Sequence, residues 1–162
     1  MSLAFDTGKF VISLDFELFW GVRDKRTIEN YGTNILGVQL AIPAMLSLFD
    51  KYEVKGTFST VGFLFAKNKE ELLANCPEIK PQYHEANLSP YNSFDAVGHN
   101  EKDDPYHFGY SLLQQIKENN SHEIGTHTFC HYYCLEPGQT PEAFKQDLLA
   151  AKKIATARGI VV

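Results

Sequence analysis

The chain has few of the features that mark secreted, nucleic-acid-binding or membrane-spanning proteins. Its 162 residues include only three cysteines, Cys76, Cys130 and Cys134, and this odd number suits a reducing compartment rather than a disulfide framework. No basic run exceeds an isolated pair and the formal net charge is -5, which disfavours nucleic acid as a partner. No apolar stretch approaches the roughly 20 residues of a membrane span, and the start MSLAFDTGKF lacks a basic-then-apolar signal peptide. We therefore expect a cytoplasmic protein with no membrane span.

The composition is sufficient for one hydrophobic core. Hydrophobic residues make up 44% of the chain, and neither repeats nor low-complexity segments divide it. We expect a single domain over residues 1–162 with an irregular excursion at about 67–110. From residue 75 onward this excursion is rich in Pro, Asn, Tyr and Asp and has no clean period. Long loops inside compact domains are usually functional or mobile.

Outside the excursion, strand-like and helix-like segments alternate. Segments with the pattern of buried strands occur at residues 9–20, 54–64, 122–126 and, as an opening only, 160–162. Segments with the pattern of helices occur at residues 35–52, 110–119 and 141–157, and residues 67–74 suit a short helix or a turn. This succession predicts an α/β fold with parallel strands and right-handed crossovers. Sites in such folds gather at the carboxyl ends of the strands.

Two of the predicted helices have recognisable boundaries. In the helix at 35–52, apolar residues recur every fourth position, and the regular part is expected to begin near Pro43, because proline is tolerated in a first turn. These residues are Leu36, Leu40, Ala44, Leu48 and Tyr52. The helix at 141–157 has Thr140 as its cap and Gly159 as its stop.

Two acidic residues in the first strand are candidates for chemistry. Asp15 and Glu17 share one face of a segment otherwise rich in Phe, Ile and Leu. Burying an isolated carboxylate costs several kcal/mol unless a cation or a donor meets it. One carboxylate bound to a metal and the other activating water would explain both, whereas the structural alternative is a salt bridge to Arg23, Lys9 or Arg26.

Two histidines, His127 and His131, end the segment HTFCH beside a predicted strand end. A spacing of four places both imidazoles on one face if the segment is helical. Two imidazoles and one carboxylate could hold a divalent metal and leave one position open for water. The alternative is a pair of capping histidines without metal.

Other residues admit both a functional and a structural interpretation. Cys130 and Cys134 complete the pattern H-x-x-C-H-x-x-C, which suits a closed zinc site, although Cys130 also suits a small buried filler. Trp20 and Phe19 could stack on a sugar ring or pack in the core. Residues of the excursion that could reach a site, or only cap turns, are His99, Asp104, Tyr106 and His107.

Three segments, in order, resemble NodB-type polysaccharide deacetylases (carbohydrate esterase family 4). The segment from His127 to His131 matches the family motif His-(Ser/Thr)-x-x-His in full, and its lead-in SHEIGTH is similar to Gly-His-Glu-Ile-Gly-x-His. Residues 56–62, GTFSTVG, are similar to the family strand Ala-Thr-Phe-Phe-x-x-Gly. Residues 13–17, SLDFE, correspond to the motif Thr-Phe-Asp-Asp-Gly.

The resemblance implies a fold, an activity and a set of site residues. The fold is a partial distorted (β/α) barrel, and the activity is metal-dependent removal of acetyl groups from an N-acetylated saccharide or polysaccharide. Glu17, His127 and His131 would bind the metal, and Asp15 would be the base that takes the proton of the attacking water. The two acids could also have exchanged roles. The cofactor would be a divalent metal, with zinc foremost and Co, Ni, Fe or Mn open.

The chain departs from the family pattern in two ways. The adjacent Asp-Asp pair is replaced by Asp15-Phe16-Glu17, which moves the ligand role to Glu17. The later motifs, an Arg-containing segment and a histidine general acid, are missing, so the chain resembles an N-terminal fragment. An incomplete barrel would expose strand edges and could self-associate. Two alternative functions follow: a non-catalytic sugar-binding or scaffold domain, and a hydrolase of another non-peptide C–N bond.

Overall fold

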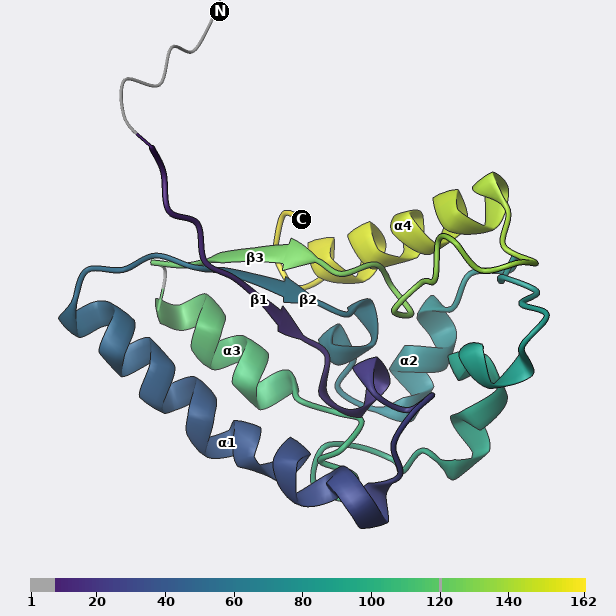
Figure 1. The fold of residues 1–162 in the computed structure, drawn as a ribbon, viewed down its shortest axis with the longest axis horizontal. Helices are drawn as coiled ribbons and strands as arrows, with labels where there is room; N and C mark the ends of the chain where they lie inside the picture. Colours follow the sequence, from purple (N-terminus) through teal and green to yellow (C-terminus); the bar gives the residue numbers. More distant parts are fainter. Residues whose placement is uncertain (1–7, 120) are drawn as a thin grey trace, which may run out of the picture.

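A parallel three-stranded sheet lies at the centre of the structure, a computed structural model that describes residues 8–119 and 121–162 (Figure 1). The strands β1 (Ser13–Phe16), β2 (Thr57–Thr60) and β3 (Glu123–Thr126) are adjacent in that order. Their register aligns the last residues of all three, so the carboxyl ends meet at one edge. The predicted α/β class with parallel strands is confirmed. The described residues form an open sheet, and no barrel is seen among them.

Four helices surround this sheet. They are α1 (Ile28–Lys51), α2 (Lys69–Asn75), α3 (Tyr110–Asn119) and α4 (Pro141–Thr156). Short 3-10 turns are η1 (Leu18–Gly21), η2 (Gly62–Phe65), η3 (Ala86–Leu88) and η4 (Pro90–Ala96). Helices α1 and α3 lie side by side under the sheet, and α4 lies close to η2 (Figure 1). The helices predicted at 110–119 and 141–157 are confirmed, with Thr140 as the cap of α4.

The strands are shorter than predicted from residues 9–20 and 54–64. Only four residues of each segment pair in the sheet, and each strand runs into a 3-10 turn, η1 or η2. Leu18 starts the first turn with a φ of 50°, which no strand residue adopts. The turn residues Leu18, Phe19 and Trp20 are nonetheless buried. An apolar run therefore marked burial correctly but overstated the length of the strand.

Helix α1 begins at Ile28, not near Pro43 as predicted. Thr27 and Asn30 form a reciprocal capping box, which fixes the start of the helix well before the proline. Pro43 lies on the exposed side of the helix, where its ring meets solvent rather than packed side chains. A proline inside a helix costs about 3 kcal/mol, and packing of the buried face offsets this cost.

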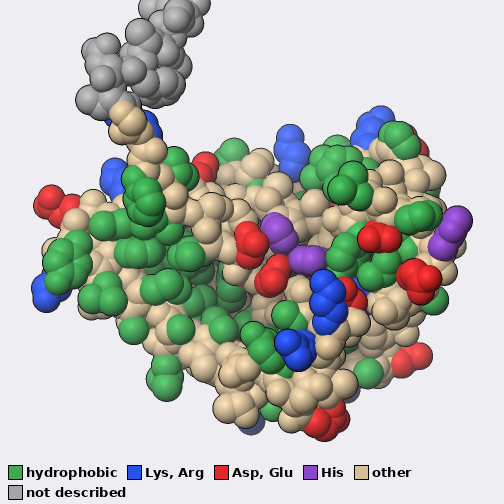
Figure 2. Space-filling view, viewed as in Figure 1, with side chains coloured by type: hydrophobic (Ala, Val, Ile, Leu, Met, Phe, Trp, Pro, Cys, Tyr) green, Lys and Arg blue, Asp and Glu red, His purple; other side chains and the backbone are tan. Residues whose placement is uncertain are grey.

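The apolar stripe predicted for this helix faces solvent rather than the core. Leu40 is 80% exposed and Leu48 53% exposed, and both belong to the stripe spaced by four. The residues of α1 that reach the core are Gly32, Ile35, Ile42 and Leu46. Apolar residues occur all around α1, so periodicity alone could not select the buried side. Hydrophobic side chains consequently gather on the surface over β1 and α1 (Figure 2).

Helix α1 is also long and apolar enough to cross a membrane, by length and composition only. Its most apolar 18-residue window has a mean hydropathy of 1.4, and 22% of that window is buried. The core helix of a folded domain and an N-terminal signal sequence have similar properties. The absence of a membrane span and the cytoplasmic location therefore stay predictions.

Residues 160–162 do not form the predicted strand. Gly159 adopts a φ of 65°, and the N–H of Ile160 donates to the Ala155 carbonyl at 3.0 Å. This pattern closes the end of α4 with a left-handed residue, as glycine commonly does. Ile160 then packs into the core at 7% exposure.

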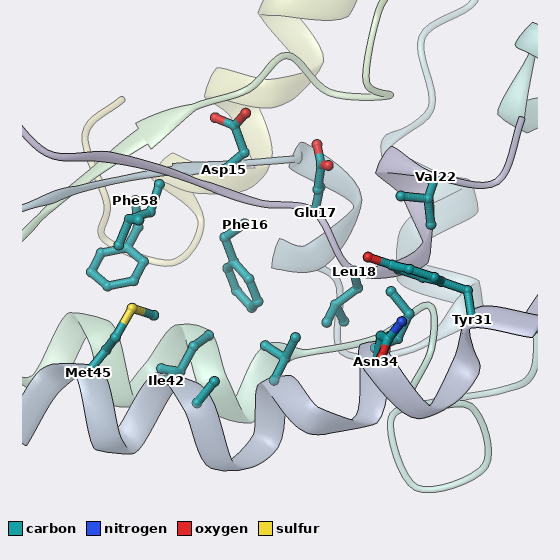
Figure 3. Close-up of a pocket in the computed structure, with 14 residues that line it drawn as sticks. Asp15, Phe16, Glu17, Leu18, Val22, Tyr31, Asn34, Ile42, Met45 and Phe58 are labelled. Carbon is teal, nitrogen blue, oxygen red and sulfur yellow. The ribbon is translucent and has the colours of Figure 1, made fainter. Parts of the chain in front are cut away.

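The two faces of the sheet differ in polarity. Phe16 and Phe58 point toward α1 (Figure 3), and the strand register places Ile124 on the same face; all three are buried. The opposite face carries polar side chains that bond across the strands, at 3.2 Å between the Ser13 and Ser59 hydroxyls and 2.6 Å from Thr57 to Glu123. Asp15 lies on this polar face near the carboxyl edge, where a site is expected in a parallel sheet.

Candidate metal centre

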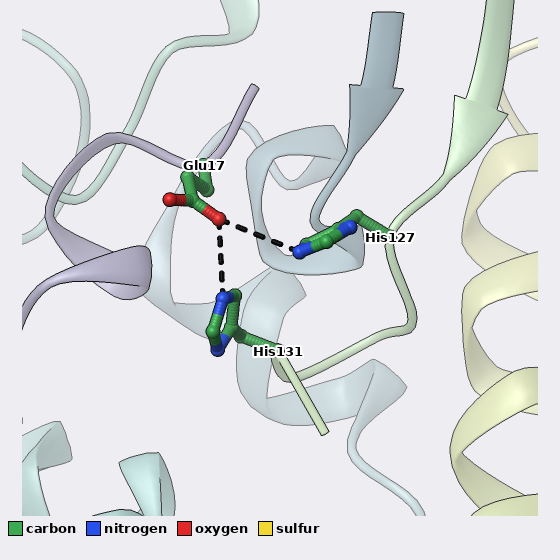
Figure 4. A group of neighbouring side chains, drawn as sticks. All are labelled: Glu17, His127 and His131. Carbon is green, nitrogen blue, oxygen red and sulfur yellow. Dashed lines mark ion pairs between the residues drawn. The ribbon is translucent and has the colours of Figure 1, made fainter. Parts of the chain in front are cut away.

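Glu17, His127 and His131 converge at the carboxyl edge of the sheet (Figure 4). One carboxylate oxygen of Glu17 lies 3.1 Å from Nε2 of His131 and 3.5 Å from Nε2 of His127. One ligand atom from each residue lies within 4.8 Å of the others. Histidines and acidic side chains occupy the middle of this face (Figure 2). The structure thus brings together the three residues predicted as ligands.

Glu17 reaches the histidines because the chain turns sharply after β1. It has left the strand, with φ -138° and ψ -14°, and precedes η1. One turn later, Gly21 leaves the space that the carboxylate fills, because a Cβ built on Gly21 would overlap the Glu17 carboxyl group. A hydrogen bond with His131 and attraction to both imidazoles lower the pKa of Glu17, although burial opposes the shift. The carboxylate is therefore the favoured form beside the histidines.

The two histidines flank a turn at residues 128–130, so the segment is not helical and the helical condition for the spacing of four is not met. Thr128 has a φ of 62° and His131 a φ of 57°, both in the left-handed region that non-glycine residues rarely adopt. Such conformations cost of order 1–3 kcal/mol each and persist only where surrounding contacts fix them. The imidazole rings nevertheless meet, with centroids 5.1 Å apart. The two imidazoles thus come together at a turn whose backbone is strained at Thr128 and His131.

Backbone contacts from η2 fix one side of this turn. The N–H of Gly62 donates to the Thr128 carbonyl at 2.8 Å, and the N–H of Phe63 donates to the Phe129 carbonyl at 3.0 Å. A Cβ on Gly62 would lie 2.6 Å from the Phe129 Cα, so only glycine allows this approach. Phe129 is fully buried beneath the turn.

A buried carboxylate from α4 fixes the other side. Asp147, with 0% exposure, accepts the N–H of Phe129 at 2.6 Å and the N–H of Cys130 at 3.2 Å. Burial raises the pKa of Asp147, and hydrogen bonds from the Cys130 side chain and from these two N–H groups oppose the rise. Asp147 was not among the predicted site residues. Its signal was the acid at 147 within the otherwise apolar stripe of α4, whose buried members are Ala143, Ala150, Ala151, Ile154 and Ala155.

Asp15 lies beside the group of three rather than within it. Its Oδ1 is 3.8 Å from Nδ1 of His127, the ring nitrogen that faces away from Glu17, and its side chain is 58% exposed. Within the described parts of the chain, both acids have ion pairs only with histidines, so the predicted alternatives with Arg23, Lys9 or Arg26 are wrong. Arg23 instead donates to the carbonyls of Asn87 and Leu88.

The closed Cys/His zinc site is not formed. Cys130 is 1% exposed beneath the turn, and burial raises the pKa of its thiol well above the usual value. Cys134 is exposed, and neither sulfur belongs to the group of three ligands. Cys130 is the small buried filler of the alternative interpretation.

Trp20 and Phe19 belong to the core and offer no platform for a sugar. Trp20 has 0% exposure, packs edge-on against Phe63 at 4.7 Å between centroids, and donates from Nε1 to the His107 carbonyl at 2.9 Å. His107 pairs with Asp104 at 2.8 Å between Nδ1 and Oδ2, and both are buried. These contacts hold the excursion against η1. The four excursion residues are outside the group of three ligands.

An apolar trough of about 320 Å³ lies between β1 and α1 (Figure 3). Phe16, Ile42 and Met45 line it, whereas the carboxylates of Asp15 and Glu17 point to the other side of β1 (Figure 3). Asp15 and Glu17 thus border the trough, but their carboxylates do not enter it. A smaller hollow of about 200 Å³ is lined by both histidines.

The donor set fits a divalent ion. Two imidazole nitrogens and one carboxylate oxygen are the ligands of catalytic zinc sites that keep a fourth position open. The same donors accept Co, Ni, Fe or Mn. Glu17 is 24%, His131 18% and His127 33% exposed, so water could reach an ion held between them.

Comparison with known proteins found no matching family model, no similar curated protein and no similar solved structure.

Proposed function

We propose that this chain is a metal-dependent hydrolase that removes acetyl groups from an N-acetylated saccharide or polysaccharide. Its fold would then be part of a distorted (β/α) barrel of the polysaccharide deacetylase type. The observation that carries the proposal is the convergence of Glu17, His127 and His131, which come from segments more than 100 residues apart in the chain. The resemblance of residues 121–131 to the family histidine motif supports the same reaction.

Each site residue has a defined role in this proposal. Glu17, His127 and His131 hold a divalent metal, which when bound supplies a Lewis acid for the acetamide carbonyl and for water. Asp15, on the exposed polar face, accepts the proton of the attacking water as general base. The hollow beside the histidines leaves room for the acetamide group.

The metal content of the purified chain tests the proposal. We expect about one zinc per chain after equilibration with Zn²⁺, as two imidazoles and a carboxylate would provide. His131→Ala should lose this ion, and His99→Ala should retain it, because His99 is an exposed histidine outside the ligand group, 78% exposed. Absence of stoichiometric zinc in the unmodified chain would contradict the metal site.

Release of acetate from an N-acetylated chito-oligosaccharide tests the reaction. The zinc-loaded chain should release acetate, and His131→Ala should not. Zinc binding without acetate release from N-acetylated saccharides would favour the alternatives, a non-catalytic sugar-binding or scaffold domain or a hydrolase of another C–N bond.

A further inference from the structure

Asp147 carries a buried carboxylate whose hydrogen bonds go to the histidine turn. It accepts the N–H groups of Phe129 and Cys130, and no cation pairs with it in the described residues. Its exposed fraction is 0%. Burying an ionised carboxylate without a cation is costly, and a neutral side chain would satisfy ordinary packing on this face of α4 at lower cost.

The position of these two N–H groups connects Asp147 to the ligands. Phe129 and Cys130 lie between Thr128 and His131, the two left-handed residues of the turn. A carboxylate that accepts both N–H groups fixes the peptide planes between the strained positions. His131 follows Cys130 directly, so the orientation of those planes sets the direction of its imidazole.

The other hydrogen bonds to this turn do not reach the N–H groups of Phe129 and Cys130. Gly62 and Phe63 bind the carbonyls of Thr128 and Phe129, so they hold the opposite side of the turn and leave its N–H groups free. The Thr128 hydroxyl accepts the N–H of Tyr132 at 2.7 Å, beyond the second histidine. The N–H groups at the centre of the turn therefore depend on the α4 carboxylate.

We propose that Asp147 is a positioning residue for the metal centre, which holds the turn so that His127 and His131 converge on Glu17. This inference rests on the proposed metal site. Partners that orient ligands typically contribute 10–100-fold to metal affinity, and we expect Asp147→Asn to lose affinity in that range. An asparagine has nearly the same shape, but only one of its two terminal atoms can accept an N–H.

The experiment measures Zn²⁺ affinity by competition with a chromophoric chelator, and the visible absorption of bound Co²⁺ at saturation. A role in stability alone would lower the melting temperature without changing the Co²⁺ spectrum, which reports ligand geometry. Asp104→Asn is the matched control, because Asp104 is also a buried acid that accepts loop N–H groups but lies outside the ligand group. It should destabilise the fold and leave both metal readouts unchanged.

Weaker zinc binding and an altered Co²⁺ spectrum in folded Asp147→Asn, but not in Asp104→Asn, would support the role. Asp147→Ser, which is smaller and retains one acceptor, is measured if Asp147→Asn does not fold. Wild-type affinity and spectrum in a folded variant would overturn the inference about Asp147 but not the proposed function. The same holds if neither variant folds, because Asp147 would then act on folding rather than on the metal centre. Failure of the unmodified chain to bind Zn²⁺ would overturn the proposed function as well.

Discussion

Two carboxylates two residues apart occupy different environments at the carboxyl edge of the sheet. Glu17 contacts both imidazoles at Nε2, whereas Asp15 is more exposed and faces the far nitrogen of His127. This asymmetry favours Glu17 as the ligand and Asp15 as the base. It follows from the turn after β1, which carries Glu17 out of the strand while Asp15 stays in it.

Asp15→Asn and Glu17→Gln should therefore have opposite effects. Asp15→Asn should keep nearly full zinc content and lose roughly 100-fold or more in acetate release, the usual contribution of a general base. Glu17→Gln should lose zinc, because a neutral amide is a poor replacement for a carboxylate ligand. Elemental analysis and an acetate assay on both variants decide the assignment; loss of zinc in Asp15→Asn would mean that the roles are exchanged.

Gly21→Ala should weaken the metal site without removing a ligand. The new methyl group would occupy the space of the Glu17 carboxyl group, and this flexible side chain can swing aside, so the fold should survive. Gly21 is outside the left-handed region, so alanine adds no backbone strain there. We expect zinc affinity to fall by roughly 10-fold or more, with an unchanged circular dichroism spectrum. Wild-type affinity in this variant would show that Glu17 is not held as described.

At the scale of elements, the site depends on three short segments that meet at the sheet edge. The turn after β1 supplies Glu17, the turn after β3 supplies the histidines, and η2 after β2 supports the histidine turn. Parallel strands in register place all three turns together. The packing of η2 against the histidine turn therefore helps to place the two histidines at this edge.

Gly62→Ala tests this packing. Its Cβ would lie 2.6 Å from the Phe129 Cα, and backbone atoms on both sides cannot yield easily. We expect the free energy of unfolding to fall by about 1–3 kcal/mol, the usual cost of overpacking, as measured by urea denaturation. Gly37→Ala is the control, since Gly37 has nothing within 4 Å and lies in α1, where alanine should stabilise the helix. Equal stability of the two variants would contradict the close approach.

At the scale of the whole molecule, the pair of Asp104 and His107 fastens the excursion to the core. Burial alone would raise the pKa of Asp104, but hydrogen bonds from the His107 ring and from the N–H of Gly98 outweigh it and lower the pKa. A carboxyl whose pKa is lower in the folded state stabilises the fold above its unfolded pKa of about 3.9. That contribution is lost as the pH falls through the folded pKa.

Asp104→Asn should remove this pH-dependent contribution. At pH 7 we expect a loss of about 1–3 kcal/mol, because buried donors lose a charged acceptor. The difference from wild type should shrink as the pH falls below about 4. Urea denaturation at pH 7 and at low pH measures the free energy of unfolding under both conditions. The control is Asp103→Asn, because Asp103 is the exposed neighbour of Asp104. A difference that does not change with pH would refute the role of the charge.

The apolar surface over β1 and α1 leads us to expect self-association. Val11 is 75% exposed and Leu40 80% exposed, and in the described chain β1 has a partner strand on one side only. Leu40→Glu should reduce concentration-dependent association, because a charge resists burial in an apolar contact. Sedimentation velocity at several concentrations measures the change. A chain that remains monomeric at all of them would refute the expectation.

Sequence alone was sufficient for the α/β class, for the helices at 110–119 and 141–157, and for choosing Glu17, His127 and His131 as residues that come together. The class and the helices rest on local periodicity and capping residues, and the three site residues stand in short motifs that a sequence displays directly. Only the tertiary structure decided which face of α1 is buried, where the strands end, and how a strained turn brings the histidines together. The same is true of Gly21, Gly62 and Asp147, whose roles come from contacts between segments distant in sequence. Such contacts leave little trace in local patterns, since a glycine or a single acid has many local explanations.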